Sequence, residues 1–127
     1  MSEPLLGVVI CHRGLAGALV EATVAVTGIA DGLVPVTNDG CDTPALFERI
    51  ARVVAGRPAV LFVDLPGGSC RMGAALAARG HRDVAVVSGA SLPMLLDFVF
   101  HRDATPAAAA TRAAEVGVRG ITTAVGG

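Results

Sequence analysis

Two runs of apolar residues, each ended by a polar side chain, constrain the fold of this chain more than any other feature. The first run, Leu5–Cys11, ends at His12. The second run, Ala59–Val63, ends at Asp64. Continuous apolar runs of this length, rich in β-branched residues, are typical of strands buried on both faces of a parallel sheet. We therefore expect His12 and Asp64 at the carboxyl ends of two strands, the edge of an open α/β sheet where ligands bind.

Segments with helical spacing of apolar residues separate these strands. Helices are expected over 15–27, 44–54, 71–79, 92–99 and 106–116, with Thr43, Ser91 and Thr105 as N-caps. Strands are expected over 5–11, 33–37, 59–63, 84–87 and, from two glycines and several β-branched residues, 117–125. Pro35 cannot donate to a strand ladder, so we expect the strand over 33–37 at a sheet edge.

Strands that alternate with helices in this way predict an α/β fold: a doubly wound, mainly parallel open sheet with helices on both faces. A chain of 127 residues, of which 53% are hydrophobic, is expected to form one domain over 1–127 with a buried core. If the first and third strands are neighbours, the backbones at His12 and Asp64 stand about 4.8 Å apart, so the two side chains can touch.

Composition argues against several classes of function. A net charge of −1, with four Phe and neither Trp nor Tyr, gives no basic or aromatic surface for nucleic acid. The sequence contains no lysine, which excludes a P-loop and Schiff-base chemistry. No G-x-S-x-G motif is present, so a serine-hydrolase elbow is not expected either.

Cysteine usage and the N-terminal segment predict a cytoplasmic protein without a metal site. Cys11, Cys41 and Cys70 are odd in number and lack CxxC spacing, so they indicate neither a disulfide framework nor a zinc site. The apolar run that ends at Cys11 is too short for a signal or membrane segment, and no basic region precedes it.

The candidate site combines an imidazole, a carboxylate and a glycine-rich helix start. A carboxylate beside His12 would hold one ring nitrogen as N–H and leave the other as a nucleophile or base. Gly67, Gly68 and Ser69 would offer backbone N–H groups to an anion such as phosphate. Together these features favour phosphoryl chemistry. On the residues alone two alternatives stay open: Asp64 caps the following turn, and Gly-Gly-Ser is an ordinary turn.

Three motifs in order carry a resemblance to a known family. They are HRGLAGAL at 12–19, FVDLPGGS at 62–69 and SGASLPML at 88–95, and each stands at the end of an expected strand. In this order and spacing they resemble the IIA domain of the mannose family of the bacterial sugar phosphotransferase system (PTS). The resemblance extends over nearly the whole chain, from Leu6 to about Ile121.

The resemblance implies a phosphocarrier with His12 and Asp64 as catalytic residues and no cofactor. His12 would take a phosphoryl group on Nε2 from the carrier HPr and pass it to a IIB component, while Asp64 orients Nδ1–H. Gly67, Gly68 and Ser69 would bind the phosphate. The family fold ends in an antiparallel strand that is exchanged in a homodimer, and the membrane would be reached only indirectly, through a permease complex.

Several positions depart from the family pattern. Arg13 stands where the family has glycine, and its charge makes it a further candidate for phosphate binding. Cys70 and Met72 replace a proline and an asparagine, and Ser91 replaces an asparagine. These changes leave an alternative function open, a regulatory IIA-like module that senses PTS phosphorylation without a dedicated transporter. A phosphocarrier of dihydroxyacetone kinases is disfavoured, because residues 89–95 match the mannose group.

Overall fold

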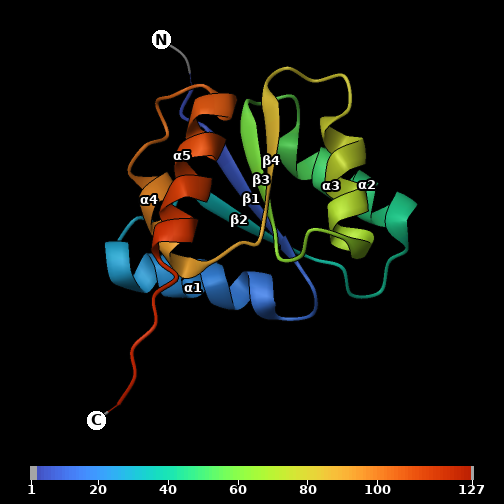
Figure 1. Ribbon diagram of the computed structural model, residues 1–127. Helices are drawn as coiled ribbons and strands as arrows, with labels where there is room; N and C mark the ends of the chain where they lie inside the picture. Colours follow the sequence, from blue (N-terminus) through green and yellow to red (C-terminus); the bar gives the residue numbers. More distant parts are fainter. Residues whose placement is uncertain (1–2, 127) are drawn as a thin grey trace.

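Four parallel strands form the central sheet of the computed structural model, which describes residues 3–126 (Figure 1). Their order across the sheet is β2-β1-β3-β4. The strands are β1 (Leu6–Cys11), β2 (Leu33–Thr37), β3 (Ala59–Val63) and β4 (Val84–Ser88). The predicted α/β class is confirmed, and β2 lies at a sheet edge as the proline in it indicated.

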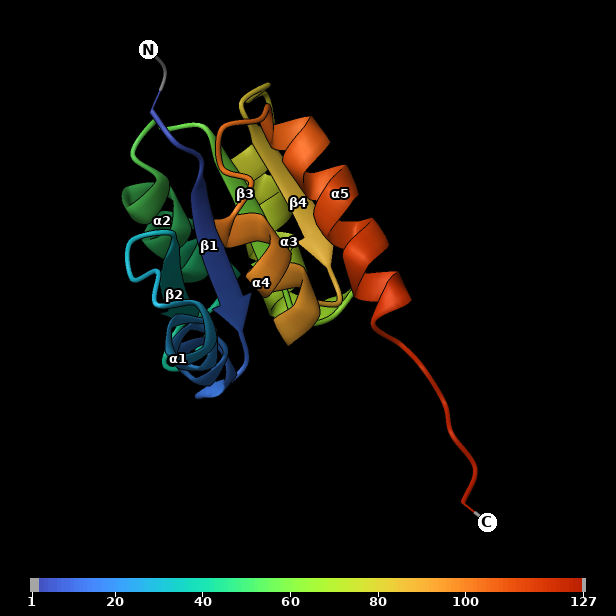
Figure 2. The ribbon, with the colours of Figure 1, turned by 90° about the vertical axis from the view of Figure 1, so that its left-hand side faces the viewer.

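Helices cover both faces of the sheet (Figures 1 and 2). One face carries α1 (Leu15–Thr27), α4 (Leu92–Val99) and α5 (Pro106–Arg119). The other face carries α2 (Thr43–Val54) and α3 (Gly68–Ala78). None of the helices within residues 3–126 is long and apolar enough to cross a membrane.

Alternation along β1 and β3 divides the core into two layers. Val9 and Cys11 of β1 pack toward α1, α4 and α5, whereas Val8 and Ile10 pack toward α2 and α3. Successive side chains of a strand point to opposite faces, so a strand that is covered on both sides must be apolar throughout. On the first side, the ring of Phe62 meets the ring of Phe98 edge to face, with centroids 5.1 Å apart.

Two helix starts differ from the prediction. Asp42, and not Thr43, is the N-cap of α2, because its carboxylate accepts a hydrogen bond of 2.9 Å from the Ala45 N–H. Helix α3 begins at Gly68, three residues before the expected start at Arg71. Glycine has a low helix propensity, so the sequence pattern predicted the helix to begin only after Gly-Gly-Ser.

The strand expected over 117–125 does not form within the single chain, and its first part, residues 117–119, is helical instead, whereas exchange of a strand with a second copy stays a prediction. Helix α5 continues to Arg119, and residues 121–126 follow as a tail without strand pairing that leaves the body of the molecule (Figures 1 and 2). A strand needs a neighbour for its backbone hydrogen bonds, and the described part of the chain offers this tail none. The strand β4 is correspondingly an edge strand, and only Val87 in it is buried rather than the whole strand.

Gly7 in β1 occupies a position where no larger residue fits. A Cβ atom there would stand 2.6 Å from Leu33 Cδ2 and 2.6 Å from Phe98 Cε2, both in the packed core. Gly17 in α1 is the opposite case, because a Cβ atom there meets nothing within 4 Å.

We expect Gly7→Ala to lower the free energy of unfolding by about 1–3 kcal/mol, since overpacking forces core side chains or the backbone to move. The matched substitution Gly17→Ala should raise the free energy of unfolding by about 0.5–1 kcal/mol, because alanine favours an exposed helical position. Urea unfolding of both variants measures these changes. Equal stability of the two variants would contradict the packing described around Gly7.

Candidate functional site

His12 and Asp64 meet at the carboxyl edge of the sheet, directly after the neighbouring strands β1 and β3. Their ring Nδ1 and carboxylate Oδ2 lie 2.8 Å apart, and the backbone N–H of His12 donates to the same Oδ2 over 2.9 Å. From β1 the chain continues into α1 on one face, and from β3 into α3 on the other, so the pair occupies the switch point of the open sheet. The expected contact between the two side chains is present.

Asp64 is placed to act as an ionised acceptor. Burial by itself would raise the pKa of its carboxyl, but the hydrogen bonds from the His12 backbone and ring, and the charge of His12, hold that pKa below its usual value. An ionised carboxylate only accepts hydrogen bonds, so the ring nitrogen that faces it carries the hydrogen. The Asp64 side chain is 9% exposed and that of His12 is 39% exposed, which leaves the imidazole open to a partner.

The loop after His12 is held by residues at the end of β2. The N–H of Arg13 donates to Asn38 Oδ1 over 3.2 Å, and its carbonyl accepts from Thr37 Oγ1 over 2.8 Å. Arg13 has a φ of 57°, in the left-handed region that favours glycine. Arginine adopts this left-handed conformation here, and its charged side chain is exposed.

Asn38, which directly follows β2, links three parts of the site. Its backbone N–H donates to the Cys11 carbonyl over 3.2 Å, and its side-chain amide donates to Ser69 Oγ over 3.5 Å. Together with the bond from Arg13, these contacts tie β2 to β1 and to the start of α3. No motif marks Asn38, because its partners are distant in sequence.

The predicted phosphate-binding residues Gly67, Gly68 and Ser69 form the first turn of α3 and its N-cap. Gly68 has a φ of 85°, which requires glycine, and both glycines are exposed. The first N–H groups of a helix have no partner within the helix, and the helix dipole favours an anion there. This turn stands in the same loop as Asp64, so the imidazole of His12 and the start of α3 lie at the same edge of the sheet.

Cys70 lies directly beside His12 in the site. Its Sγ is buried and stands 3.8 Å from His12 Nδ1. Burial, and after it the charge of Asp64, raises the pKa of the Cys70 thiol to about 11. Cys11 is buried on the opposite face of the sheet, where burial and then Asp64 raise its pKa to about 12. Both thiols are therefore protonated at neutral pH.

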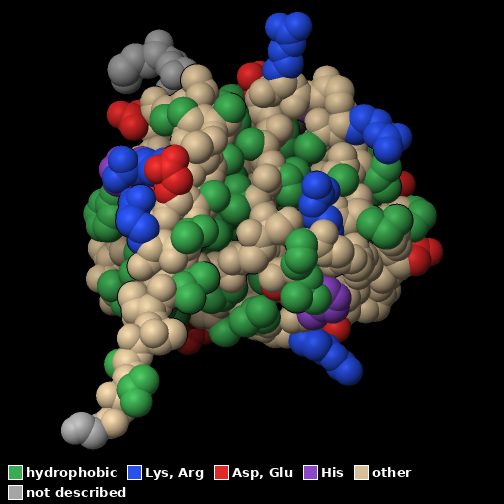
Figure 3. All heavy atoms as spheres, in the orientation of Figure 1, with side chains coloured by type: hydrophobic (Ala, Val, Ile, Leu, Met, Phe, Trp, Pro, Cys, Tyr) green, Lys and Arg blue, Asp and Glu red, His purple; other side chains and the backbone are tan. Residues whose placement is uncertain are grey.

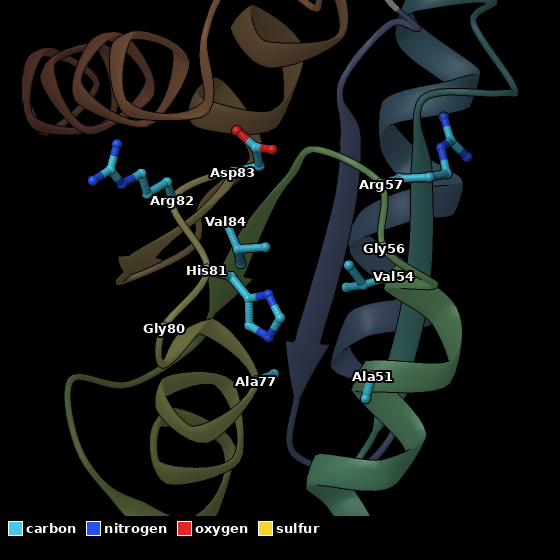
Figure 4. A pocket seen from close by; sticks show the side chains of 10 residues that line it. All are labelled: Ala51, Val54, Gly56, Arg57, Ala77, Gly80, His81, Arg82, Asp83 and Val84. Atoms are coloured by element: carbon cyan, nitrogen blue, oxygen red, sulfur yellow. The ribbon is translucent and has the colours of Figure 1, made fainter.

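A pocket of about 280 Å³ lies at the opposite edge of the sheet, between α2 and α3 (Figure 4). His81 points into it, whereas Arg57, Arg82 and Asp83 extend away from its apolar floor. Arg57 and Asp83 precede β3 and β4, so this pocket is separated from His12 by the length of the strands. None of the predicted site residues lines it.

Fold and site together define an open α/β domain that holds a histidine–aspartate pair beside a glycine-rich helix start. The family model EIIA-man, PTS system fructose IIA component, matches residues 7–115. The chain therefore belongs to this family of PTS IIA components, which implies phosphotransfer in general. The resemblance to the mannose-family IIA domain is confirmed. No curated protein matches the chain.

Solved structures agree with the family in fold. The phosphotransferase system component EIIA from Streptococcus agalactiae superimposes with a TM-score of 0.86 at 17% identity, covering 94% of this chain and 96% of that one. The mannose/sorbose specific IIA subunit from Enterococcus faecalis superimposes with a TM-score of 0.84 at 18% identity, covering 97% of this chain and 96% of that one. A sigma-54 interaction domain protein from Enterococcus faecalis superimposes with a TM-score of 0.75 at 10% identity, covering 94% of each chain.

Proposed function

We propose that the chain, as a single IIA domain over 1–127, is a phosphocarrier of the PTS. His12 accepts a phosphoryl group from phosphorylated HPr and passes it to a IIB component for sugar uptake and phosphorylation. The observation that carries this proposal is the half-exposed imidazole whose Nδ1 lies 2.8 Å from the buried carboxylate of Asp64. This arrangement supplies a nucleophile of fixed tautomer that a second protein can reach.

The reaction exchanges one nitrogen–phosphorus bond for another. The lone pair of His12 Nε2 forms a bond to phosphorus while the bond to the histidine of HPr breaks, and no proton needs to leave His12. Positive charge develops on the ring, and the Asp64 carboxylate stabilises this charge through the Nδ1 hydrogen bond. Transfer onward to a IIB component is the same step in reverse, with phosphohistidine 12 as donor.

The phosphoryl oxygens are bound by the start of α3 and by Arg13. Unpaired backbone N–H groups of the Gly67-Gly68-Ser69 turn, and the positive end of the helix dipole, favour the negative charge that the oxygens carry. The exposed guanidinium of Arg13 stands in the loop directly after His12 and adds a mobile positive charge. Such a site works by positioning and electrostatics.

The chain acts as a homodimer and meets the membrane only through a permease complex. Strand β4 has a free edge in the described part of the chain, and the tail over 121–126 carries Ile121 and Val125, which are 79% and 97% exposed. Figure 3 shows hydrophobic side chains along this tail and on the face that α5 and β4 share. If the tail of one subunit pairs with the β4 edge of the other, the backbone N–H and C=O groups of both segments gain hydrogen-bond partners.

A second candidate function is a regulatory IIA-like module that senses PTS phosphorylation without a dedicated transporter. It rests on the positions that depart from the family pattern, Arg13, Cys70, Met72 and Ser91, and the fold is also that of a sigma-54 interaction domain protein. In this case His12 would still accept the phosphoryl group. Retention of the phosphoryl group in the presence of IIB components would support this second function over the first.

We expect His12→Ala to abolish phosphorylation and Asp64→Asn to slow it by roughly 10²-fold, because the amide neither carries the charge nor fixes the same tautomer. Intact-mass spectrometry after incubation with phosphoenolpyruvate, Enzyme I and HPr measures the uptake, and peptide mapping locates the acid-labile phosphate. His81→Ala, at the far edge of the sheet, is the matched control and should be phosphorylated normally. Phosphorylation of the His12→Ala variant would contradict the site.

The role of Arg13 is tested by Arg13→Gly, because glycine adopts a φ of 57° without strain and removes only the guanidinium. We expect phosphoryl transfer from HPr to slow roughly fivefold, the effect of a surface charge pair of about 1 kcal/mol, and less so at high salt. Arg13→Lys keeps the charge and should retain most of the rate. A glycine variant as fast as the natural chain would exclude a role for the charge.

The homodimer is tested by removing the tail. Light scattering after gel filtration should give a dimer mass for the full chain and a monomer mass for a chain that ends at Gly120, because the edge of β4 then has no strand to pair with. A chain that ends at Val125 keeps both exposed apolar residues and should remain a dimer. Identical masses for the full and shortened chains would exclude pairing through the tail.

A further inference from the structure

We propose that His12, Asp64 and Cys70 form a zinc site, and that a bound zinc ion withdraws His12 from phosphoryl transfer. The second half of this proposal rests on the proposed function, whereas the first half stands on the geometry alone. Within residues 3–126, these three side chains form a group of potential ligands whose nitrogen, oxygen and sulfur atoms all lie within 4.8 Å of one another.

The spacing of the ligand atoms is close to that of a tetrahedral zinc ion. Zinc binds nitrogen and oxygen at about 2.0 Å and sulfur at about 2.3 Å, so tetrahedral ligand atoms stand roughly 3.3–3.6 Å apart. His12 Nδ1 lies 3.8 Å from Cys70 Sγ and 2.8 Å from Asp64 Oδ2. All the ligand atoms lie within 4.8 Å of one another, so side-chain shifts of about 1 Å would bring the three groups to the spacing around one zinc ion.

The kinds of ligand select zinc over magnesium or calcium. Imidazole and thiolate are ligands of zinc, whereas magnesium and calcium prefer oxygen throughout. Three protein ligands leave one position of the tetrahedron open for water. The half-exposed ring of His12 forms the solvent side of the group, so a metal ion can enter there, while Cys70 and Asp64 form its buried side.

Asp64 provides an independent observation that favours a cation. Its side chain is 91% buried and its Oδ2 accepts both hydrogen bonds from His12, but its Oδ1 is buried without a hydrogen-bond partner among the described residues. A buried carboxylate oxygen without a partner is unfavourable, because it has lost its hydrogen bonds to water and makes no hydrogen bond within the protein. Zinc bound through Oδ1 would remove this deficit and leave the hydrogen bond from the His12 backbone intact.

Zinc binding and phosphorylation exclude each other through the ring tautomer. Coordination uses the lone pair of Nδ1, so the ring proton moves from Nδ1 to Nε2, and the Cys70 thiol gives up its proton to solvent. A neutral imidazole bound to metal at Nδ1 carries hydrogen on Nε2 and has no lone pair there to attack phosphorus. The same residue that makes His12 a nucleophile, Asp64, would thus also hold the metal that blocks it.

The metal site is tested first by binding, with tag-free reduced protein. Competition of Zn²⁺ with a chromophoric chelator should give one site per chain, and Co²⁺ should give a sulfur-to-metal charge-transfer band in the near ultraviolet. We expect Cys70→Ser to remove this band and to weaken zinc binding at least about tenfold, since even an outer partner of a ligand contributes that much. His12→Ala should weaken it similarly.

Cys41→Ser is the matched control, because Cys41 is a neighbouring thiol whose Sγ donates to the Asn38 carbonyl over 3.2 Å and is not among the three ligands. It should keep both the zinc affinity and the cobalt band. Absence of zinc binding by the natural chain, or equal binding by the Cys70→Ser variant, would overturn the zinc site.

The second test compares phosphorylation by HPr with and without zinc, each variant against itself. Zinc at saturation should stop phosphate uptake by the natural chain, and a chelator should restore it. Inhibition of the Cys70→Ser variant, relative to its own zinc-free rate, should need at least about tenfold more zinc, whereas inhibition of Enzyme I or HPr would slow both chains alike. Phosphate uptake that continues while zinc is bound would overturn the claim that zinc binding and phosphorylation exclude each other. Failure of the zinc-free chain to take up phosphate would instead contradict the proposed function and leave the binding test decisive for the site.

Discussion

Asp64 Oδ2 accepts two hydrogen bonds from one residue, the backbone N–H and the ring of His12, and the site depends on this double contact. The backbone bond fixes where the chain turns after β1, and the ring bond fixes the direction of the imidazole. Both require β1 and β3 to be adjacent and parallel, so that their carboxyl ends meet at one edge. The apolar residues of both strands are buried on each face, which makes this pairing the centre of the core as well as the base of the site.

The position of the pair was predictable because two different signals agree. Continuous apolar runs indicate central strands of a parallel sheet, and a polar residue directly after such a run stands at the functional edge. His12 and Asp64 satisfy both conditions, and so does the glycine-rich turn that begins α3. The order of the strands then brings them together. Local pattern and topology were sufficient here because each residue follows its own strand directly.

Other parts of the site depend on contacts that no local pattern records. Asn38 is a turn residue by sequence, yet it bonds to the Cys11 carbonyl and lies beside Ser69. Cys70 lacks any ligand spacing, because its partners His12 and Asp64 come from two other segments of the chain. The start of the last expected strand illustrates the opposite error: Val118 is β-branched and favours a strand by propensity, but residues 117–119 extend α5.

Cys70 places a thiol beside the imidazole of His12, on the buried side of the site. The hydrogen bond between His12 and Asp64 measures 2.8 Å, and the loop after His12 forms with arginine at a φ of 57°. In the proposed zinc site, this thiol is the third ligand, 3.8 Å from the Nδ1 atom of the same ring. As long as that thiol keeps its proton, the imidazole remains a nucleophile directed outward. A metal ion that displaces the proton would turn the ring into a ligand, because one nitrogen lone pair of a neutral imidazole cannot serve both roles.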